Sequence, residues 1–223
     1  MKTEKLAAFF ACLLIMLSLV GCAVGRKLSY SEIRTDISTG AGLTYAIATH
    51  DQREEVVDGS QNESYVGYMR STVGIAYPIS TASGRNFSDD FSLVIKNSLN
   101  ESKDTCQIIQ TRASESKDQV LNRLITAQCD RLLLFTVTKW RTDSKPKGMQ
   151  YGTDVLWDLT LEVFNKNAEP LASDRTNGVD PDLDLNAVGG SVKRTQVIVN
   201  EKFKQKIDLL LDDPGIQKTL RGE

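Results

Sequence analysis

Few residues of this chain carry side chains that could perform covalent or metal chemistry. The sequence contains one histidine, His50, and four cysteines, at positions 12, 22, 106 and 129. Most catalytic zinc sites use two or more histidines, so a single histidine excludes them. The spacing of the cysteines also resembles no zinc-binding pattern. We therefore predict no metal site and no cofactor.

Two pairs of residues have the types that catalysis uses. Ser114 and Lys117 have the S-x-x-K spacing of serine acyl-enzymes, but the S-D-N and K-T-G motifs that accompany it in those enzymes are absent. A helix N-cap explains Ser114 better. His50 and Asp51 are neighbours on an expected strand, where successive side chains point to opposite faces, so they form a poor proton relay. We predict a surface histidine and a protein that is not an enzyme.

Residues 1–21 have the composition of a secretory signal peptide. Lys2 and Lys5 precede a run of uncharged, mostly apolar residues, 6–20. A membrane-spanning helix needs about 20 apolar residues, so this run is too short to be one. A basic start followed by a short apolar run is typical of a signal peptide. We therefore predict export from the cytoplasm and removal of residues 1–21.

The sequence Leu19-Val20-Gly21-Cys22 at the end of this run resembles the lipobox of bacterial lipoproteins. The resemblance implies cleavage between Gly21 and Cys22 and acylation of Cys22. One acyl chain binds a membrane only marginally, at ~0.8 kcal/mol per buried methylene, so stable anchoring uses two or more chains. Ala23 follows the cysteine, where an aspartate would retain an enteric-type lipoprotein in the inner membrane. We expect a lipid-anchored protein of the outer membrane that faces the periplasm.

The composition is that of an ordinary globular protein. Of the 223 residues, 40% are hydrophobic and 25% are charged, which excludes a disordered tail, a collagen-like repeat and a polytopic membrane protein. The net charge of -2 provides no positive field for nucleic acid. After the signal peptide, we predict a lipidated tether over residues 22–42, one periplasmic domain over 43–212 and a C-terminal tail over 213–223.

Hydrophobic periodicity divides residues 43–212 into strands and helices. Residues 132–135 are apolar at every position, which indicates a central strand buried on both faces, whereas residues 155–163 alternate, which indicates a half-buried strand. We predict an α+β (mixed α/β) fold: one mixed parallel and antiparallel sheet of about four to five strands, packed by three helices, with a hairpin insert. The expected elements are strands 43–49, 106–110, 131–140 and 155–163, a hairpin over 65–77, a short strand near Leu171, an acidic loop after it, and helices 88–99, 116–128 and 187–212.

Cys106 and Cys129 remain once the signal peptide is removed and Cys22 is acylated. The periplasm is oxidising, and a disulfide can persist there. The two cysteines lie at the starts of two parallel strands joined by one helix. Neighbouring strands lie ~4.8 Å apart, within the ~4.4–6.8 Å Cα separation of a disulfide. We predict a Cys106–Cys129 disulfide; the alternative is two buried thiols that act as small hydrophobic side chains.

A set of turn and core positions resembles the YajG-type uncharacterised lipoproteins: Asp51-Gln52-Arg53, Gly59, Val66-Gly67, and Ser83-Gly84 leading to Phe91 and Ser98-Leu99. Residues 132–164 are similar in pattern to a wider set that includes the N-terminal domain of TolB, penicillin-binding-protein activator lipoproteins and the auxiliary lipoproteins of lipid-transport ABC systems. The resemblance covers residues 43–212. It implies a periplasmic domain that binds other envelope components, and it supplies no catalytic residue.

The hairpin insert concentrates four side chains that are candidates for partner contact: Tyr65, Tyr68, Met69 and Tyr77. Aromatic and methionine side chains are favoured in interface cores, although these four could instead cover the sheet edge. We predict a lipid-anchored accessory or assembly protein that binds an envelope protein or glycan and has no chemistry of its own. The alternatives are a periplasmic hydrolase that uses Ser114 or His50, and a lipid-binding auxiliary subunit of an envelope transport system.

Overall fold

The computed structural model describes residues 26–40, 42–101, 105–148, 150–184 and 192–223. The predicted signal peptide and lipobox, including Gly21 and Cys22, lie outside the described residues. Within the described ranges, no helix has both the length and the hydropathy needed to cross a membrane. The elements are β1 (Arg26–Leu28), β2 (Thr44–Asp51), α2 (Glu54–Val57), β3 (Tyr65–Arg70), β4 (Ala76–Thr81), α3 (Phe87–Glu101), β5 (Thr105–Ile109), α4 (Lys117–Thr126), β6 (Arg131–Lys147), β7 (Gln150–Asn165), β8 (Pro170–Asp184), α5 (Val192–Leu211) and α6 (Pro214–Arg221).

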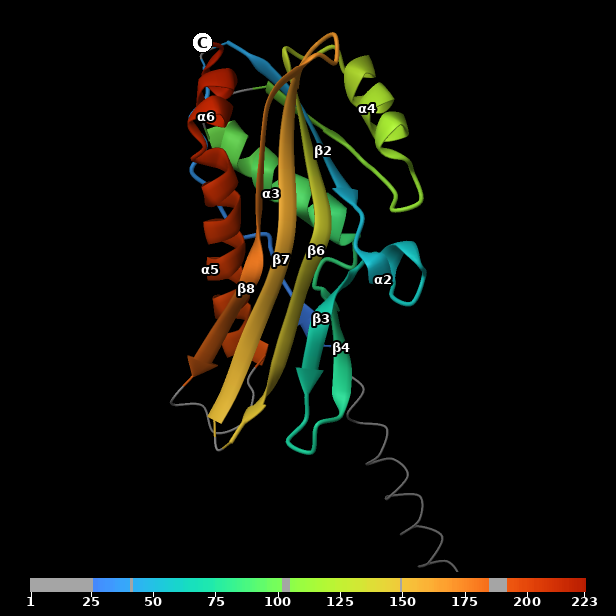
Figure 1. The fold of residues 1–223 in the computed structure, drawn as a ribbon, viewed down its shortest axis with the longest axis vertical. Helices are drawn as coiled ribbons and strands as arrows, with labels where there is room; N and C mark the ends of the chain where they lie inside the picture. Colours follow the sequence, from blue (N-terminus) through green and yellow to red (C-terminus); the bar gives the residue numbers. More distant parts are fainter. Residues whose placement is uncertain (1–25, 41, 102–104, 149, 185–191) are drawn as a thin grey trace, which may run out of the picture.

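These strands form one mixed eight-stranded sheet (Figure 1). The long strands β6, β7 and β8 pair antiparallel and make its spine. The other side of β6 has two partners in succession: β2 pairs parallel with residues 131–137, and β3 pairs parallel with residues 142–144. β5 extends the β2 branch, and β4 and β1 extend the β3 branch. The predicted α+β class and hairpin insert are confirmed, but the sheet has more strands than the four to five expected, and five helices are described where three were predicted.

The extra strand length lies outside the strands that we predicted. β6 continues past Trp140, the expected end of the strand, through Pro146 to Lys147. β8 reaches Asp184 and includes Asp180, in the segment predicted to be an acidic loop. β7 supplies the hydrogen-bonding ladder for this polar strand. The Asp180 carboxylate lies 2.6 Å from Lys206 Nζ, so its charge joins β8 to α5.

The first half of β6 is buried on both faces, as its apolar run 132–135 predicted, and the neighbouring strand β2 is also buried along its length. Leu133, Phe135 and Val137 of β6 belong to the large core beneath α3, α5 and α6. Leu132 and Leu134 of the same strand pack on the opposite face, in a smaller core beneath α4. Alternate side chains of a strand point to opposite faces, so one strand serves both cores.

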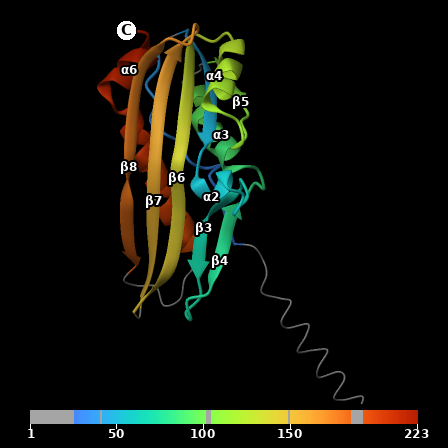
Figure 2. The same ribbon diagram turned by 45° about the vertical axis from the view of Figure 1, so that its right-hand side comes forward.

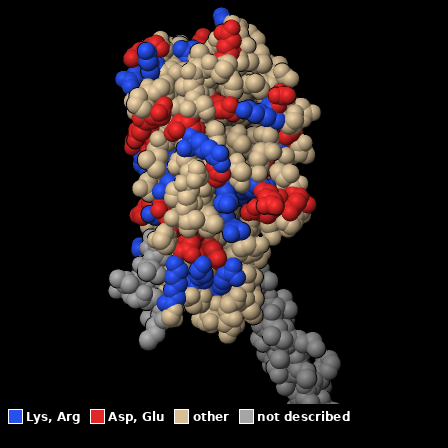
Figure 3. All heavy atoms as spheres, viewed as in Figure 1, with Lys and Arg blue, Asp and Glu red and all other residues tan. Residues whose placement is uncertain are grey.

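Among the described residues, no helix covers the outer face of the spine over most of its length, and ion pairs occupy this face. Arg175 of β8 lies 2.7 Å from Asp158 of β7, and Lys117 at the start of α4 lies 2.6 Å from Glu162. Figure 3 shows Lys and Arg atoms next to Asp and Glu atoms over this face. Paired charges keep an open sheet face soluble, and exposed pairs of this kind contribute little to stability.

Both ends of the described chain belong to the domain, which corrects two predicted boundaries. Residues 26–40 were expected to form a tether, but β1 pairs with β4, and Leu28 and Tyr30 are buried in the main core. Residues 213–223 were expected to form a tail, but they contain α6, whose Ile216 and Leu220 are buried. The apolar residues of these two end segments are far in sequence from the strands and helices predicted within 43–212, so the sequence alone does not show that they belong to the same core.

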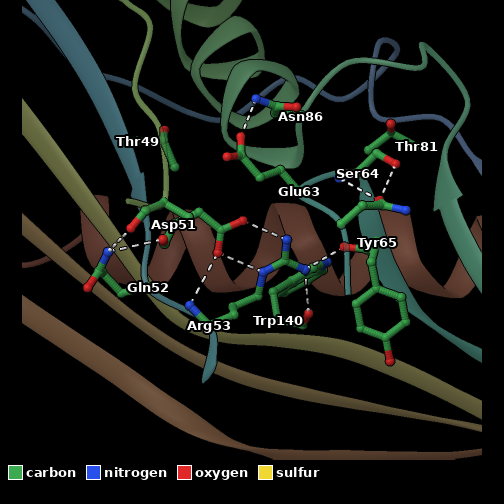
Figure 4. A network of polar contacts seen from close by, with 12 residues as sticks. Thr49, Asp51, Gln52, Arg53, Glu63, Ser64, Tyr65, Thr81, Asn86 and Trp140 are labelled. Carbon is green, nitrogen blue, oxygen red and sulfur yellow. Dashed lines mark hydrogen bonds and ion pairs between the residues drawn. The ribbon is translucent and has the colours of Figure 1, made fainter. Parts of the chain in front are cut away.

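A buried arginine joins the two branches of the sheet (Figure 4). The chain leaves β2 at Asp51, and Arg53 turns back into the gap between β2 and β3. Its guanidinium makes a bidentate pair with Asp51, with N–O distances of 2.8 and 2.6 Å. It also donates to the carbonyl oxygens of Tyr65 in β3, at 2.5 Å, and Trp140 in β6, at 3.3 Å. Its carbon atom Cζ lies 4.8 Å from the centre of the Phe87 ring.

We call the place where β6 changes its partner from β2 to β3 the branch point. Buried carbonyl groups need hydrogen-bond donors, and the ladder does not supply them where β6 changes partner, so Arg53 does. β3 then approaches β6 closely at Gly67, which has φ +145° and where an added Cβ would lie 2.2 Å from the Thr142 carbonyl oxygen. Only glycine fits both the backbone angle and this contact.

We expect Arg53→Met to reduce the free energy of unfolding by about 3–5 kcal/mol, because it leaves Asp51 buried without its counter-ion. Urea unfolding followed by circular dichroism measures the change. Arg175→Met is the matched control: it removes an exposed arginine from a pair with Asp158 and should cost about 1 kcal/mol or less. Equal losses in the two variants would show that the buried pair has no special role.

Candidate functional site

A groove lies along the open edge of β5. β5 ends its branch of the sheet and pairs with β2, and Figure 2 shows it between α3 and α4. The helices pack on opposite faces of the sheet, so the strand edge lies between them. The hollow has a volume of about 540 Å³, within the ~300–1,000 Å³ range of ligand pockets. Its lining residues are Arg85, Asp89, Leu93, Ile108, Ile109, Gln110, Arg123 and Thr126.

The charged groups around the groove are mostly held in pairs. Arg123 lies 2.6 Å from Glu115, and Arg85 lies 3.1 Å from Asp90. Burial alone would raise the pKa of Glu115, but hydrogen bonds from Arg123 and a backbone amide outweigh it and hold that pKa below its usual value. Burial raises the pKa of Asp89, against the weaker opposing effect of nearby arginines. The groove therefore offers apolar contacts and a few oriented polar groups, without a strong field of one sign.

Local sequence explains how α4 forms one wall of this groove. Ser116 is its N-cap and makes a capping box with Gln119: the Ser116 hydroxyl accepts from the Gln119 amide, and the Gln119 side chain accepts from the Ser116 amide. Such reciprocal bonds satisfy two amides at a helix start. Val120 and Leu124 then anchor the helix on the smaller core, which leaves Arg123 and Thr126 beside β5.

The structure separates the residues of the two catalytic candidates. Ser114 is exposed before α4, and the nearby Lys117 is ion-paired with Glu162. His50 was expected at the surface but is only 2% exposed, because the start of α4 and its preceding loop cover the end of β2. Its Nε2 lies 2.8 Å from the Glu115 carbonyl oxygen. These contacts are those of a packed histidine, and they bring no second catalytic group to Ser114.

The four hairpin candidates have different environments. Tyr65 and Met69 are each 2% exposed and pack in the interior, which corrects their assignment as contact residues. Tyr68 is half-buried, and its ring meets the Tyr65 ring edge-on at 5.2 Å. Tyr77 is 41% exposed and stays a candidate for contact. Because Arg53 draws the base of β3 against β6, the inward-facing side chains of β3 become core.

The predicted Cys106–Cys129 disulfide is absent from the described residues. The error lies in the strand order: β2 pairs with both β5 and β6 and so lies between them. Two strand spacings amount to about 10 Å, beyond the Cα separation that a disulfide allows. The cysteines also face different cores, Cys106 the larger and Cys129 the smaller. Burial raises the pKa of the Cys129 thiol, which keeps it protonated and unreactive.

Sequence reasoning did not identify the groove at β5. Its parts come from the segment before α3, from β5 and from α4, and no short motif joins them. The helical stripe of α4 could have indicated which side chains face away from the core. The position of β5 at an open edge could not be read from the sequence, because it depends on β2 pairing between β5 and β6.

Comparisons with known proteins give only distant structural similarity. No protein-family model and no curated protein matches this chain. A crystal structure of a DUF330-family protein from Xanthomonas campestris is 10% identical, covers 86% of this chain and 94% of its own, and has a TM-score of 0.47. The PelC dodecamer from Paraburkholderia phytofirmans is 10% identical, with 76% and 92% covered and a TM-score of 0.37. Lipoprotein GNA1162 from Neisseria meningitidis is 13% identical, with 73% and 99% covered and a TM-score of 0.27. These likenesses are too distant to transfer a residue role, and the YajG-type resemblance stays a prediction.

We expect both internal thiols to be reduced in protein isolated from an oxidising compartment. A chain that begins at Ala23 lacks Cys12 and Cys22, so denaturation without reductant should expose two reactive thiols. In the folded state both should label slowly, because Cys106 is 9% exposed and Cys129 is 3% exposed. Mass spectrometry after alkylation counts the labels. A denatured protein that takes up none would restore the disulfide and contradict the strand order.

Proposed function

We propose that this chain is a lipid-anchored periplasmic accessory protein that binds an extended segment of another envelope protein along the open edge of β5. The single observation that carries the proposal is the groove of about 540 Å³ at that edge. An edge strand presents backbone donors and acceptors to an added strand, and nearby pockets select its side chains. The groove combines both features.

The chemistry of the groove favours a peptide over the other ligand classes considered. Leu93, Ile108 and Ile109 provide apolar contacts, which alternate side chains of an added strand could meet. Arg85 and Arg123 already have acidic partners, so they do not form the unpaired basic cluster that a phosphate or nucleic acid would need. An extended segment with small apolar side chains fits these groups best.

The lipobox supports the proposed location of the protein, anchored to a membrane and facing the periplasm. Cys22 would carry the acyl chains, and Ala23 favours the outer membrane over the inner membrane. The YajG-type resemblance of residues 43–212 agrees with a periplasmic domain that works by binding. An anchored accessory protein needs no catalytic group, and Lys117 and His50 make structural contacts with Glu162 and the Glu115 carbonyl oxygen.

Cys22→Ser should abolish acylation and leave an uncleaved precursor, because the modified thiol is the substrate of lipidation. Labelling cells with radioactive palmitate and comparing the mass of the protein measures both effects. Cys106→Ser is the matched control, since it changes a cysteine inside the folded domain and should leave labelling intact. A Cys22→Ser protein that is still cut and still labelled would contradict the anchor.

A photoreactive amino acid at Gln110, in the groove, should crosslink in cells to an envelope protein, whereas one at Asn177, exposed on β8, should not. Thr126→Trp fills the groove from an exposed position and should reduce the Gln110 crosslink by about tenfold, the effect of losing ~1.4 kcal/mol of binding. Thr138→Trp, at an exposed position of β6, controls for the added bulk. A crosslink that survives Thr126→Trp would remove the groove from consideration.

A further inference from the structure

The turn that joins β3 and β4 exposes apolar side chains together. Val73 is 79% exposed, Ile75 55% and Tyr77 41%. They are three of the nine large hydrophobic side chains that are exposed among the described residues, and they fall within five consecutive positions. Single exposed hydrophobic residues are ordinary, but a cluster marks a contact surface. We call residues 71–78 the hairpin tip.

The hairpin tip is an ordered turn. The Ser71 amide donates to the Ile75 carbonyl oxygen at 2.8 Å, and the Gly74 amide donates to the Ser71 carbonyl oxygen at 2.9 Å. The Ser71 hydroxyl also accepts from the Ile75 amide at 3.1 Å. Because these bonds fix the backbone, Val73 and Ile75 are held away from the core and pay little conformational entropy on contact.

Basic side chains surround the base of the hairpin tip. Arg26 of β1 lies over the Tyr77 ring, with Cζ 4.6 Å from its centre. β6 runs parallel beside β3 and brings Lys145 and Lys147 to the same level as Arg70. Figure 3 shows a row of Lys and Arg atoms just above the lower end of the molecule, with uncharged atoms below it. The carboxylates of Asp143 and Asp154 lie at this end and pair with these bases.

The site expected to carry the acyl chains is close to this end in the chain. Arg26 is four positions after Cys22 in the sequence, so a fully extended chain can carry Cys22 about 14 Å from Arg26 at most. Arg26 is itself in contact with the hairpin: its Nη1 donates to the Met69 carbonyl oxygen at 3.2 Å. Whatever path residues 22–25 follow, an anchor at Cys22 holds the hairpin tip near the bilayer surface.

We propose that the hairpin tip docks in the headgroup region of the bilayer that holds the anchor, an inference that rests on the proposed acylation of Cys22. The apolar side chains of Val73 and Ile75 suit the lipid, the Tyr77 ring suits the membrane–water interface, and the basic side chains at the base of the hairpin tip suit anionic headgroups. The tip enters only to headgroup depth, because turn backbone groups without partners are costly in hydrocarbon. Figures 1 and 2 place β5 and α4 toward the opposite end, so docking presents the groove away from the membrane.

The test uses the full, acylated protein in vesicles of phosphatidylethanolamine and phosphatidylglycerol at about 3:1, the latter supplying the anionic headgroup. Val73→Cys carries a polarity-sensitive fluorophore, and Leu171→Cys is the matched control, 43% exposed and about 40 Å away along the sheet. Cys106 and Cys129 are buried and stay unlabelled in the folded protein. We expect a nitroxide on the lipid headgroup to quench the label at 73 at least about twice as strongly as the label at 171.

A second variant separates docking from simple nearness to the membrane. Ile75→Asp places a charge on the exposed tip, should leave the fold unchanged by circular dichroism, and should lower quenching at 73 toward the level seen at 171. Quenching at 73 that Ile75→Asp leaves unchanged would show nearness to the membrane alone and overturn docking. Equal quenching at both labels in protein that floats with the vesicles would overturn docking and leave the anchor standing. Protein that does not float would overturn both. A spectral change at 73 that grows with protein concentration without lipid would assign the tip to a second copy of this chain and overturn docking.

Discussion

The buried pair of Arg53 and Asp51 is the interaction on which the architecture depends. One long strand, β6, serves two neighbours on the same side, and the change from β2 to β3 leaves carbonyl groups without ladder partners. A guanidinium has five donors in a planar fork, so it can bind a carboxylate at two points and still reach the carbonyls of Tyr65 and Trp140. A smaller or uncharged side chain could not close this gap.

The branch point also separates the molecule into two ends with different surfaces. Above it, β2 and β5 make the edge between α3 and α4 where the groove lies. Below it, β3 and β4 extend to the hairpin tip, an ordered turn with exposed apolar residues and basic side chains around its base. Because Arg53 bonds to both β3 and β6, it fixes the direction of the hairpin relative to the spine. The proposed anchor at one end and the proposed binding groove at the other therefore keep a fixed relation to each other.

Much of the fold could be predicted because its signals are local. The apolar run at 132–135 indicated a strand between two cores. This strand begins where it was expected, and the helices predicted at 88–99 and 116–128 lie close to those positions. The turn and core residues 51–53 and 66–67 were noted for their resemblance, and they form the branch point. The polar strand β8 and the short elements β1 and α6 were missed, because pairing and packing stabilise them rather than their own periodicity.

The sequence by itself predicted a signal peptide and a lipobox at Cys22 and determined the alternation of strands and helices, because each depends on residues close together in the chain. Tertiary structure alone decided the order of the strands. With β2 between β5 and β6, Cys106 and Cys129 are too far apart to bond, and β5 becomes an open edge. Pairing between distant segments also decided which tyrosines of the hairpin are core and which are surface, because a strand buries the side chains that face its neighbours' core, wherever these neighbours lie in the sequence.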